Sequence, residues 1–188
     1  MKIAIRLAVL LLVVAPLLAW FVVKPVRVVA PRWAGLTCQS QGVCVESPEQ
    51  LAAATALYRD AVAFVDGQVG ELEGHPVIVF CATEACADMF GLGARAAVTV
   101  GTMGTVIGPR AWKPYYVRHE LIHHLQGQRF GVLHRMLMPS WLIEGMAYSL
   151  SQDPRVTLAA PWQQDRAQFN AWLGRVGLSR MWQEARGL

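Results

Sequence analysis

The four cysteines of the sequence include no C-x2-C pair, which is the spacing of many structural zinc sites. The net charge of +4 comes from scattered basic residues, and no run of Lys or Arg alternates with aromatic residues as a nucleic-acid-binding groove requires. The sequence also lacks internal repeats and low-complexity segments. These absences argue against a zinc finger, a nucleic-acid partner and a repeat architecture.

The N-terminal region contains an uncharged, almost wholly apolar run at residues 7–23, between Arg6 and Lys24. A helix of this length spans about 25 Å, slightly less than the hydrocarbon core of a bilayer, and the flanking cations can reach the headgroups. No A-x-A-like cleavage pattern follows the run. The pattern favours an N-terminal transmembrane helix that anchors the chain, with a cleaved secretory signal as the alternative.

The length of 188 residues suits one compact domain with its own hydrophobic core. We expect residues 1–30 to form the anchor, or signal segment, with its juxtamembrane stretch. Residues 31–188 then form the single domain.

The cysteines form two close pairs, Cys38 with Cys44 and Cys81 with Cys86, which suits two disulfides in an oxidising compartment. Four cysteines allow three connectivities, and we prefer 38–44 with 81–86 because each closes a short loop. The alternative is a cytosolic protein with four buried thiols. Together with the anchor, the disulfides favour a single-pass protein of the inner (cytoplasmic) membrane whose domain is periplasmic. Cleavage of the N-terminal segment would make it a secreted protein.

The apolar pattern changes from short strands to helices along the chain. Ser47-Pro48-Glu49-Gln50 carries helix-start signals, and a helical apolar stripe continues from there to Gly67. A strand at 75–81, a helix at 83–90 and a hairpin of strands 97–100 and 105–107 are expected next. The later helices are expected at about 115–128, 131–136, 140–151, 161–173 and 176–186. The class is α+β, with a small mixed sheet packed on a helical half.

His119-Glu120-Leu121-Ile122-His123 matches H-E-x-x-H. On a helix, positions i and i+4 project from one face, so two imidazoles can bind one metal ion while Glu120 lies beside them. A hydrolytic zinc site needs a further protein ligand and an open position for water. Glu144 lies in a second expected helix, far enough along the chain to fold back onto the first.

The combination of H-E-x-x-H with W-L-x-E-G-x-A, Trp141 to Ala147, resembles the gluzincin metallopeptidases, the thermolysin-like and aminopeptidase-like group of MA-type peptidases. The resemblance covers about thirty residues. It implies that His119, His123 and Glu144 bind one Zn²⁺ ion and that Glu120 is the general base of peptide-bond hydrolysis. The expected partner is a peptide or protein substrate, and endopeptidase-like specificity is favoured because the G-x-M-E-N aminopeptidase signature is absent.

Gluzincins usually supply a Tyr or His beyond the last ligand to stabilise the oxyanion, and the sequence contains neither after Tyr148. Tyr148, Tyr116 and His124 are therefore candidates for that role or for orienting a metal ligand. The strand Thr105-Val106-Ile107 resembles the edge strand with which gluzincins pair an extended substrate, and Gly104 and Gly108 flank it.

Two other hypotheses remain open at this stage. A membrane-tethered gluzincin-like domain could bind zinc and a peptide or protein partner with little or no turnover, although an intact Glu120 favours catalysis. The chain could also be a structural, disulfide-stapled domain in which H-E-x-x-H occurs by accident.

Overall fold

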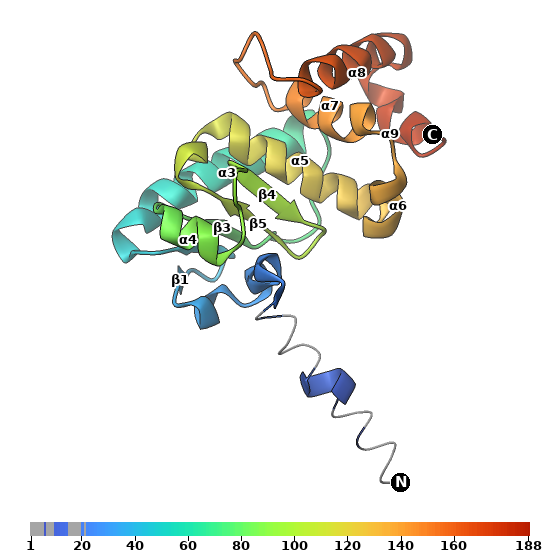
Figure 1. Cartoon of the computed structure of the whole chain (residues 1–188). Coiled ribbons are helices and arrows are strands. Elements are labelled where there is room, and N and C mark those ends of the chain that lie inside the picture. Colours follow the sequence, from blue (N-terminus) through green and yellow to red (C-terminus); the bar gives the residue numbers. More distant parts are fainter. Residues whose placement is uncertain (1–5, 7–9, 15–19, 21) are drawn as a thin grey trace.

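The computed structural model of the chain describes residues 6, 10–14, 20 and 22–188 (Figure 1). It is a mixed α+β structure built on a five-stranded sheet in the order β1-β2-β3-β5-β4. The strands are β1 (Thr37–Cys38), β2 (Val43–Val45), β3 (Ile78–Phe80), β4 (Ala97–Val100) and β5 (Gly104–Ile107). The two outer pairs, β1 with β2 and β4 with β5, are antiparallel, whereas β2, β3 and β5 run parallel. The predicted hairpin and α+β class are thus confirmed, while β1 and β2 were not predicted.

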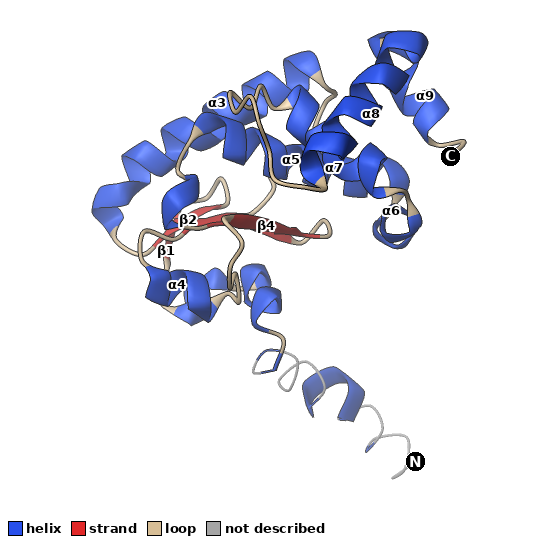
Figure 2. Cartoon of the chain, turned by 45° about the horizontal axis from the view of Figure 1, so that its top comes forward, coloured by secondary structure: helices blue, strands red, loops and turns tan. Residues whose placement is uncertain are grey.

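Helices cover both faces of the sheet, as Figure 2 shows. The long helices α3 (Leu51–Gln68) and α5 (Pro114–Phe130) lie on one face, and α4 (Glu84–Met89) lies on the other. Alternate strand residues follow this division, because Ile78 and Phe80 join the core cluster under α3 and α5 whereas Val79 joins the cluster under α4. This alternation explains why a three-residue strand can be completely buried.

A further helical layer packs on α5 and carries the end of the chain (Figure 1). It contains α6 (Val132–Leu137), α7 (Ser140–Leu150), α8 (Trp162–Val176) and α9 (Met181–Ala185). These bounds lie close to the predicted helical ranges. Gly145 of α7 faces α8, because a Cβ atom there would lie 2.3 Å from the backbone oxygen of Asp165. The small residue at position 145 therefore permits the close approach of α7 to α8.

Short helical turns complete the described chain. They are η1 (Leu10–Val14), η2 (Lys24–Val29), η3 (Pro31–Ala34), η4 (Pro48–Gln50), η5 (Pro109–Ala111) and η6 (Leu178–Arg180). The predicted helix start is confirmed, since Ser47 and Gln50 form a capping box over η4, which leads directly into α3.

Both predicted disulfides are present. Cys38–Cys44 joins opposite positions of β1 and β2, and Cys81–Cys86 joins the residue after β3 to α4. Cys44, Cys81 and Cys86 are buried in the core cluster between the sheet and α4. The two bonds thus stabilise the face of the sheet opposite α5.

The prediction that Thr105-Val106-Ile107 forms the edge strand is wrong. These residues belong to β5, which lies between β3 and β4 and is completely buried. A short β-branched run between glycines does not reveal its position in a sheet, and here the upstream strand β3 pairs with its outer side. The edge strand next to α5 is β4.

The predicted membrane anchor at residues 7–23 lies largely outside the described residues. No helix within the described part of the chain is long and apolar enough to cross a bilayer. Val28, in the stretch expected to be a juxtamembrane linker, is completely buried among core residues of the α4 face. Packing of the folded unit therefore begins before residue 31.

Candidate metal centre

The helix α5 brings His119 and His123 to the same face, one turn apart. Its other side is apolar, and Val117, Leu121 and Leu125 are completely buried in the core. The helix is thus fixed along its length, and the imidazoles, which are 8% and 7% exposed, project toward the helical layer above it. Core packing thereby holds two potential ligands in a defined direction.

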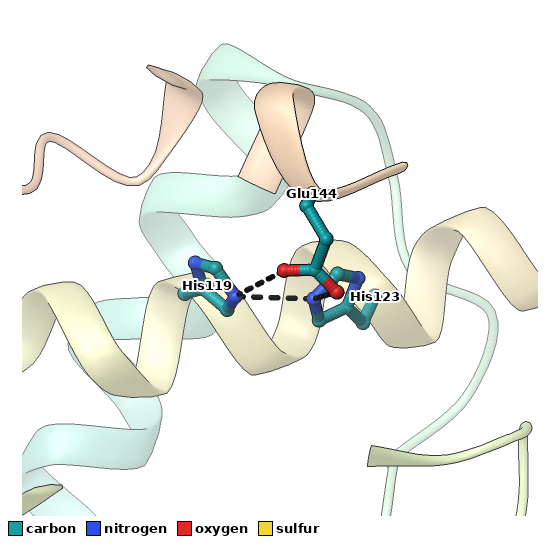
Figure 3. Close-up of side chains that lie close together, drawn as sticks. All are labelled: His119, His123 and Glu144. Atoms are coloured by element: carbon teal, nitrogen blue, oxygen red, sulfur yellow. Dashed lines mark hydrogen bonds and ion pairs between the residues drawn. The ribbon is translucent and has the colours of Figure 1, made fainter. Parts of the chain in front are cut away.

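Glu144 reaches the histidines from α7, as Figure 3 shows. The two Nε2 atoms of the histidines lie 3.1 Å apart. The carboxylate oxygens of Glu144 lie 3.7 Å from Nε2 of His119 and 3.5 Å from Nε2 of His123. The three side chains offer ligand atoms that all lie within 4.8 Å of one another, so the group could hold a metal ion.

Gln126 determines which nitrogen of His123 carries a proton. Its side-chain nitrogen donates to the backbone carbonyl of Ile143 over 2.9 Å, so its oxygen is the atom that lies 2.9 Å from Nδ1 of His123. An oxygen can only accept, so Nδ1 of His123 must donate. The lone pair of neutral His123 is therefore on Nε2, which is the atom that faces Glu144.

The electrostatics of the three side chains favour the binding of a cation between them. Burial alone would raise the pKa of Glu144, but hydrogen bonds and attraction from His119 and His123 hold that pKa well below its usual range. Burial alone would lower the pKa of His123, whereas the interaction with Glu144 raises it. The carboxylate therefore stays ionised, and lone pairs and negative charge converge on one point.

Glu120 is held beside the histidines by the edge strand of the sheet. The hydroxyl of Thr99, in β4, lies 2.8 Å from Oε2 of Glu120 and 2.9 Å from the hydroxyl of Thr105 in β5. The Thr99 hydroxyl can accept from Thr105, and its single proton lies within reach of both Oε2 and the backbone carbonyl of Glu120, which is 2.9 Å away. This arrangement orients the carboxylate, and neither threonine was predicted to support it.

A cavity of about 700 Å³ opens over these residues. Glu120, both histidines and Glu144 line it, and β4 supplies part of its wall. Arg135 from α6 and Arg155 from the loop after α7 also line the cavity. Charged groups of both signs therefore surround the cluster.

The remaining candidates occupy different positions. Tyr148 lines the cavity with its ring centroid 4.4 Å from that of His119, and Tyr116 lines it from the start of α5. Burial, together with the charge of Glu144, raises the pKa of Tyr148 to about 12, so its hydroxyl keeps its proton. His124 is not part of the cluster, and burial followed by the charge of Arg135 lowers its pKa to about 4.

No family model, curated protein or solved structure matches the chain. The fold and the site alone define its class: a mixed α+β protein with two disulfides and a His-His-Glu group, its histidines buried and its glutamate partly exposed, that could hold a metal ion.

Proposed function

We propose that the chain is a zinc-dependent peptidase in which His119, His123 and Glu144 bind one zinc ion and Glu120 is the general base. The observation that carries this proposal is the convergence of the ligand atoms from two helices at one side of an open cavity, with Glu120 beside them. The resemblance of the two sequence motifs to gluzincins is consistent with it.

The distances between ligand atoms fit zinc. A tetrahedral zinc ion with bonds of about 2.0–2.2 Å holds its ligands roughly 3.3–3.5 Å apart. The two Nε2 atoms lie 3.1 Å apart, and the nearest carboxylate oxygen of Glu144, a different one for each histidine, lies at 3.7 Å from His119 and 3.5 Å from His123. With one ligand atom taken from each residue, all three lie within 4.8 Å of one another, somewhat wider than that spacing. Two imidazoles and a carboxylate also leave a coordination position free, which distinguishes catalytic from structural zinc sites. His119, His123 and Glu144 all line the cavity, so an ion that they held would be open to it.

The reaction follows from how these groups are held. When bound, zinc polarises a carbonyl and lowers the pKa of bound water to about 7. Glu120 accepts the proton of the attacking water and passes it to the leaving amine. The hydroxyl of Thr99 keeps one oxygen of Glu120 in place, and the other oxygen is the proposed proton acceptor. Tyr148, which lines the cavity with its ring against His119, is the candidate donor to the oxyanion.

The substrate is expected to bind along β4. This strand is at the edge of the sheet and Ala97, Val98 and Thr99 line the cavity. An extended peptide can add to such an edge through backbone hydrogen bonds. The role first assigned to Thr105-Val106-Ile107 thus moves to the neighbouring strand, which also carries the residue that orients Glu120.

The compartment proposed for the reaction is extracytoplasmic. Two disulfides close short loops, and such bonds persist in oxidising environments. Attachment to the inner membrane through residues 7–23 remains part of the proposal. A reporter fused to the C-terminus that is active only in the cytoplasm would contradict this placement.

The proposal is tested by cleavage of an unbiased peptide library with the purified full-length chain, which retains the buried Val28. Wild type loaded with zinc should cleave, and Glu120→Gln should bind the same amount of zinc but cleave at least about a thousandfold more slowly, since the variant lacks the general base. Stoichiometric zinc without cleavage by wild type would instead indicate a zinc- and peptide-binding domain.

A further inference from the structure

The loop after α7 places a cation in the cavity. Arg155 and Asp153 both line the cavity that contains the metal ligands. The Asp153 side chain is only 1% exposed, whereas that of Arg155 is 37% exposed. The carboxylate is thus covered and the guanidinium is the member of the pair that a bound molecule can reach.

The guanidinium is held in one orientation. Its Nε donates to Asp153 over 2.9 Å and Nη2 donates to the same carboxylate, while Nη1 donates to the hydroxyl of Tyr116 over 3.3 Å. The backbone of the loop is fixed as well, because Arg166 donates to the carbonyls of Arg155 and Val156. Among the described residues, the remaining N–H of each terminal nitrogen has no protein acceptor.

Tyrosine rings connect this cation to the metal centre. The guanidinium carbon lies 5.4, 5.1 and 5.8 Å from the ring centroids of Tyr115, Tyr116 and Tyr148. The ring of Tyr148 in turn lies against His119. A single side chain thus bridges the guanidinium and a metal ligand. A peptide bound at the metal would extend past Arg155 within a few residues of its scissile bond.

We propose that Arg155 binds a carboxylate of the substrate, so that the peptidase prefers peptides with a negative charge close to the cleaved bond. This inference rests on the proposed function. A guanidinium with free N–H groups matches the geometry of a carboxylate, and Asp153 and the tyrosines arrange it in advance. The hydroxyl oxygen of Tyr116 accepts from Arg155, and its O–H can donate to the same carboxylate. The carboxylate can be the C-terminus of the substrate or an Asp or Glu side chain.

The alternative role of Arg155 is purely structural, as a clamp between the loop and α5. The test must therefore measure discrimination between substrates, which a structural role does not change selectively. The probes are pools of random hexapeptides: one with a free C-terminus but no Asp or Glu, one amidated with Asp and Glu, and one amidated without Asp or Glu. The measured quantity is kcat/KM for each pool with the zinc-loaded full-length chain.

Wild type should cleave one or both carboxylate-containing pools about 10- to 100-fold faster than the carboxylate-free pool, as expected for a hydrogen-bonded charge pair. Arg155→Met should reduce that ratio to near one. The ratio, and not the absolute rate, is compared with wild type, because the change also leaves the covered carboxylate of Asp153 without its cation. The pool that loses its advantage identifies the source of the carboxylate. Arg155→Lys keeps the positive charge but loses the paired N–H donors of the guanidinium, so it should retain part of the preference for the carboxylate-containing pools.

Arg95→Met is the matched control, because Arg95 also lines the cavity but its guanidinium donates to the carbonyls of Gly91 and Leu92. This variant should retain the wild-type ratio. The inference is overturned if wild type shows no preference, or if Arg155→Met slows all pools equally.

Failure of the inference is separable from failure of the proposed function. Binding of the same pools to the zinc-loaded Glu120→Gln chain is measured in parallel, since it needs no turnover. If wild type cleaves nothing but binds carboxylate pools in an Arg155-dependent way, the peptidase proposal fails and the carboxylate site stands. If wild type cleaves the peptides but neither cleaves nor binds the carboxylate-containing pools in preference to the carboxylate-free pool, the peptidase proposal stands and the carboxylate site fails.

Discussion

The side-chain oxygen of Gln126 lies 2.9 Å from Nδ1 of His123. The same side chain donates to the carbonyl of Ile143, the residue that precedes Glu144. Gln126 is completely buried and connects the histidine of one helix to the backbone that carries the carboxylate of another. One amide thereby orients a ligand on each side of the candidate metal centre.

Gln126→Leu should weaken zinc binding by about 10- to 100-fold, because removing a hydrogen-bond partner of a ligating histidine loosens its orientation. Competition with a chromophoric chelator measures this affinity. Gln128→Leu is the control, since Gln128 lies on the same helix but bonds only to the backbone of Glu73. Equal affinities for wild type and Gln126→Leu would show that the link is irrelevant to the metal.

Thr99→Val should leave zinc content unchanged and lower kcat by about 10- to 100-fold, because it removes a hydrogen bond to the side chain of Glu120 without a large change of shape. Thr99→Ser keeps the hydroxyl and should retain most of the activity. Steady-state kinetics on one cleaved peptide gives both values. Equal activity of the Val variant and wild type would mean that Thr99 does not orient the general base.

Gly145→Ala should lower the free energy of unfolding by about 1–3 kcal/mol, because the added Cβ would lie 2.3 Å from the Asp165 carbonyl oxygen and force α7 and α8 apart. Gly174→Ala in α8 is the matched control, since its added Cβ meets nothing within 4 Å. That change should raise stability by roughly 0.5–1 kcal/mol through better helix propensity. Urea denaturation distinguishes the two; equal effects would contradict the packing described.

Tyr58→Phe tests a buried hydroxyl far from the metal centre, one that donates to the carbonyl of Pro76. Burial, followed by the charge of Asp66, raises the pKa of Tyr58 from 10.0 to about 12. Between those values the unfolded chain releases the proton while the folded chain keeps it. The contribution of Tyr58 to the free energy of unfolding is therefore fully present below pH 10 and is lost as pH rises toward 12.

At neutral pH the free energy of unfolding of wild type should exceed that of Tyr58→Phe by about 1 kcal/mol, the usual contribution of a hydrogen bond. The difference should shrink between pH 10 and pH 11, where chemical denaturation of both proteins is compared. A difference that stays constant over this range would contradict the raised pKa.

Helical periodicity and motif spacing predicted the parts of the site that depend on local order. His119 and His123 share a face because of a spacing that is fixed within one helix. The capping box at Ser47 and the short disulfide loops are equally local, and the structure confirms them. Glu144 required the additional step of linking two motifs, and the structure brings it to the histidines.

Features that depend on contacts distant in sequence were predicted wrongly or not at all. The central position of β5 arises from pairing with β3, which lies more than twenty residues upstream. Thr99 acquires its role only when β4 and α5 meet at the cavity. The role of Gln126 could have been predicted from the sequence, because its position three residues after His123 places both residues on one helix face.

The most direct test of the central claim is the zinc content of the full-length chain after chelator treatment and reloading, measured by elemental analysis. Wild type is compared with the variants His119→Ala, His123→Ala and Glu144→Gln. Wild type should bind one zinc ion per chain, and each variant should bind it at least about tenfold more weakly. A wild-type chain without zinc, or variants that retain it with wild-type affinity, would contradict the assignment of His119, His123 and Glu144 as its ligands.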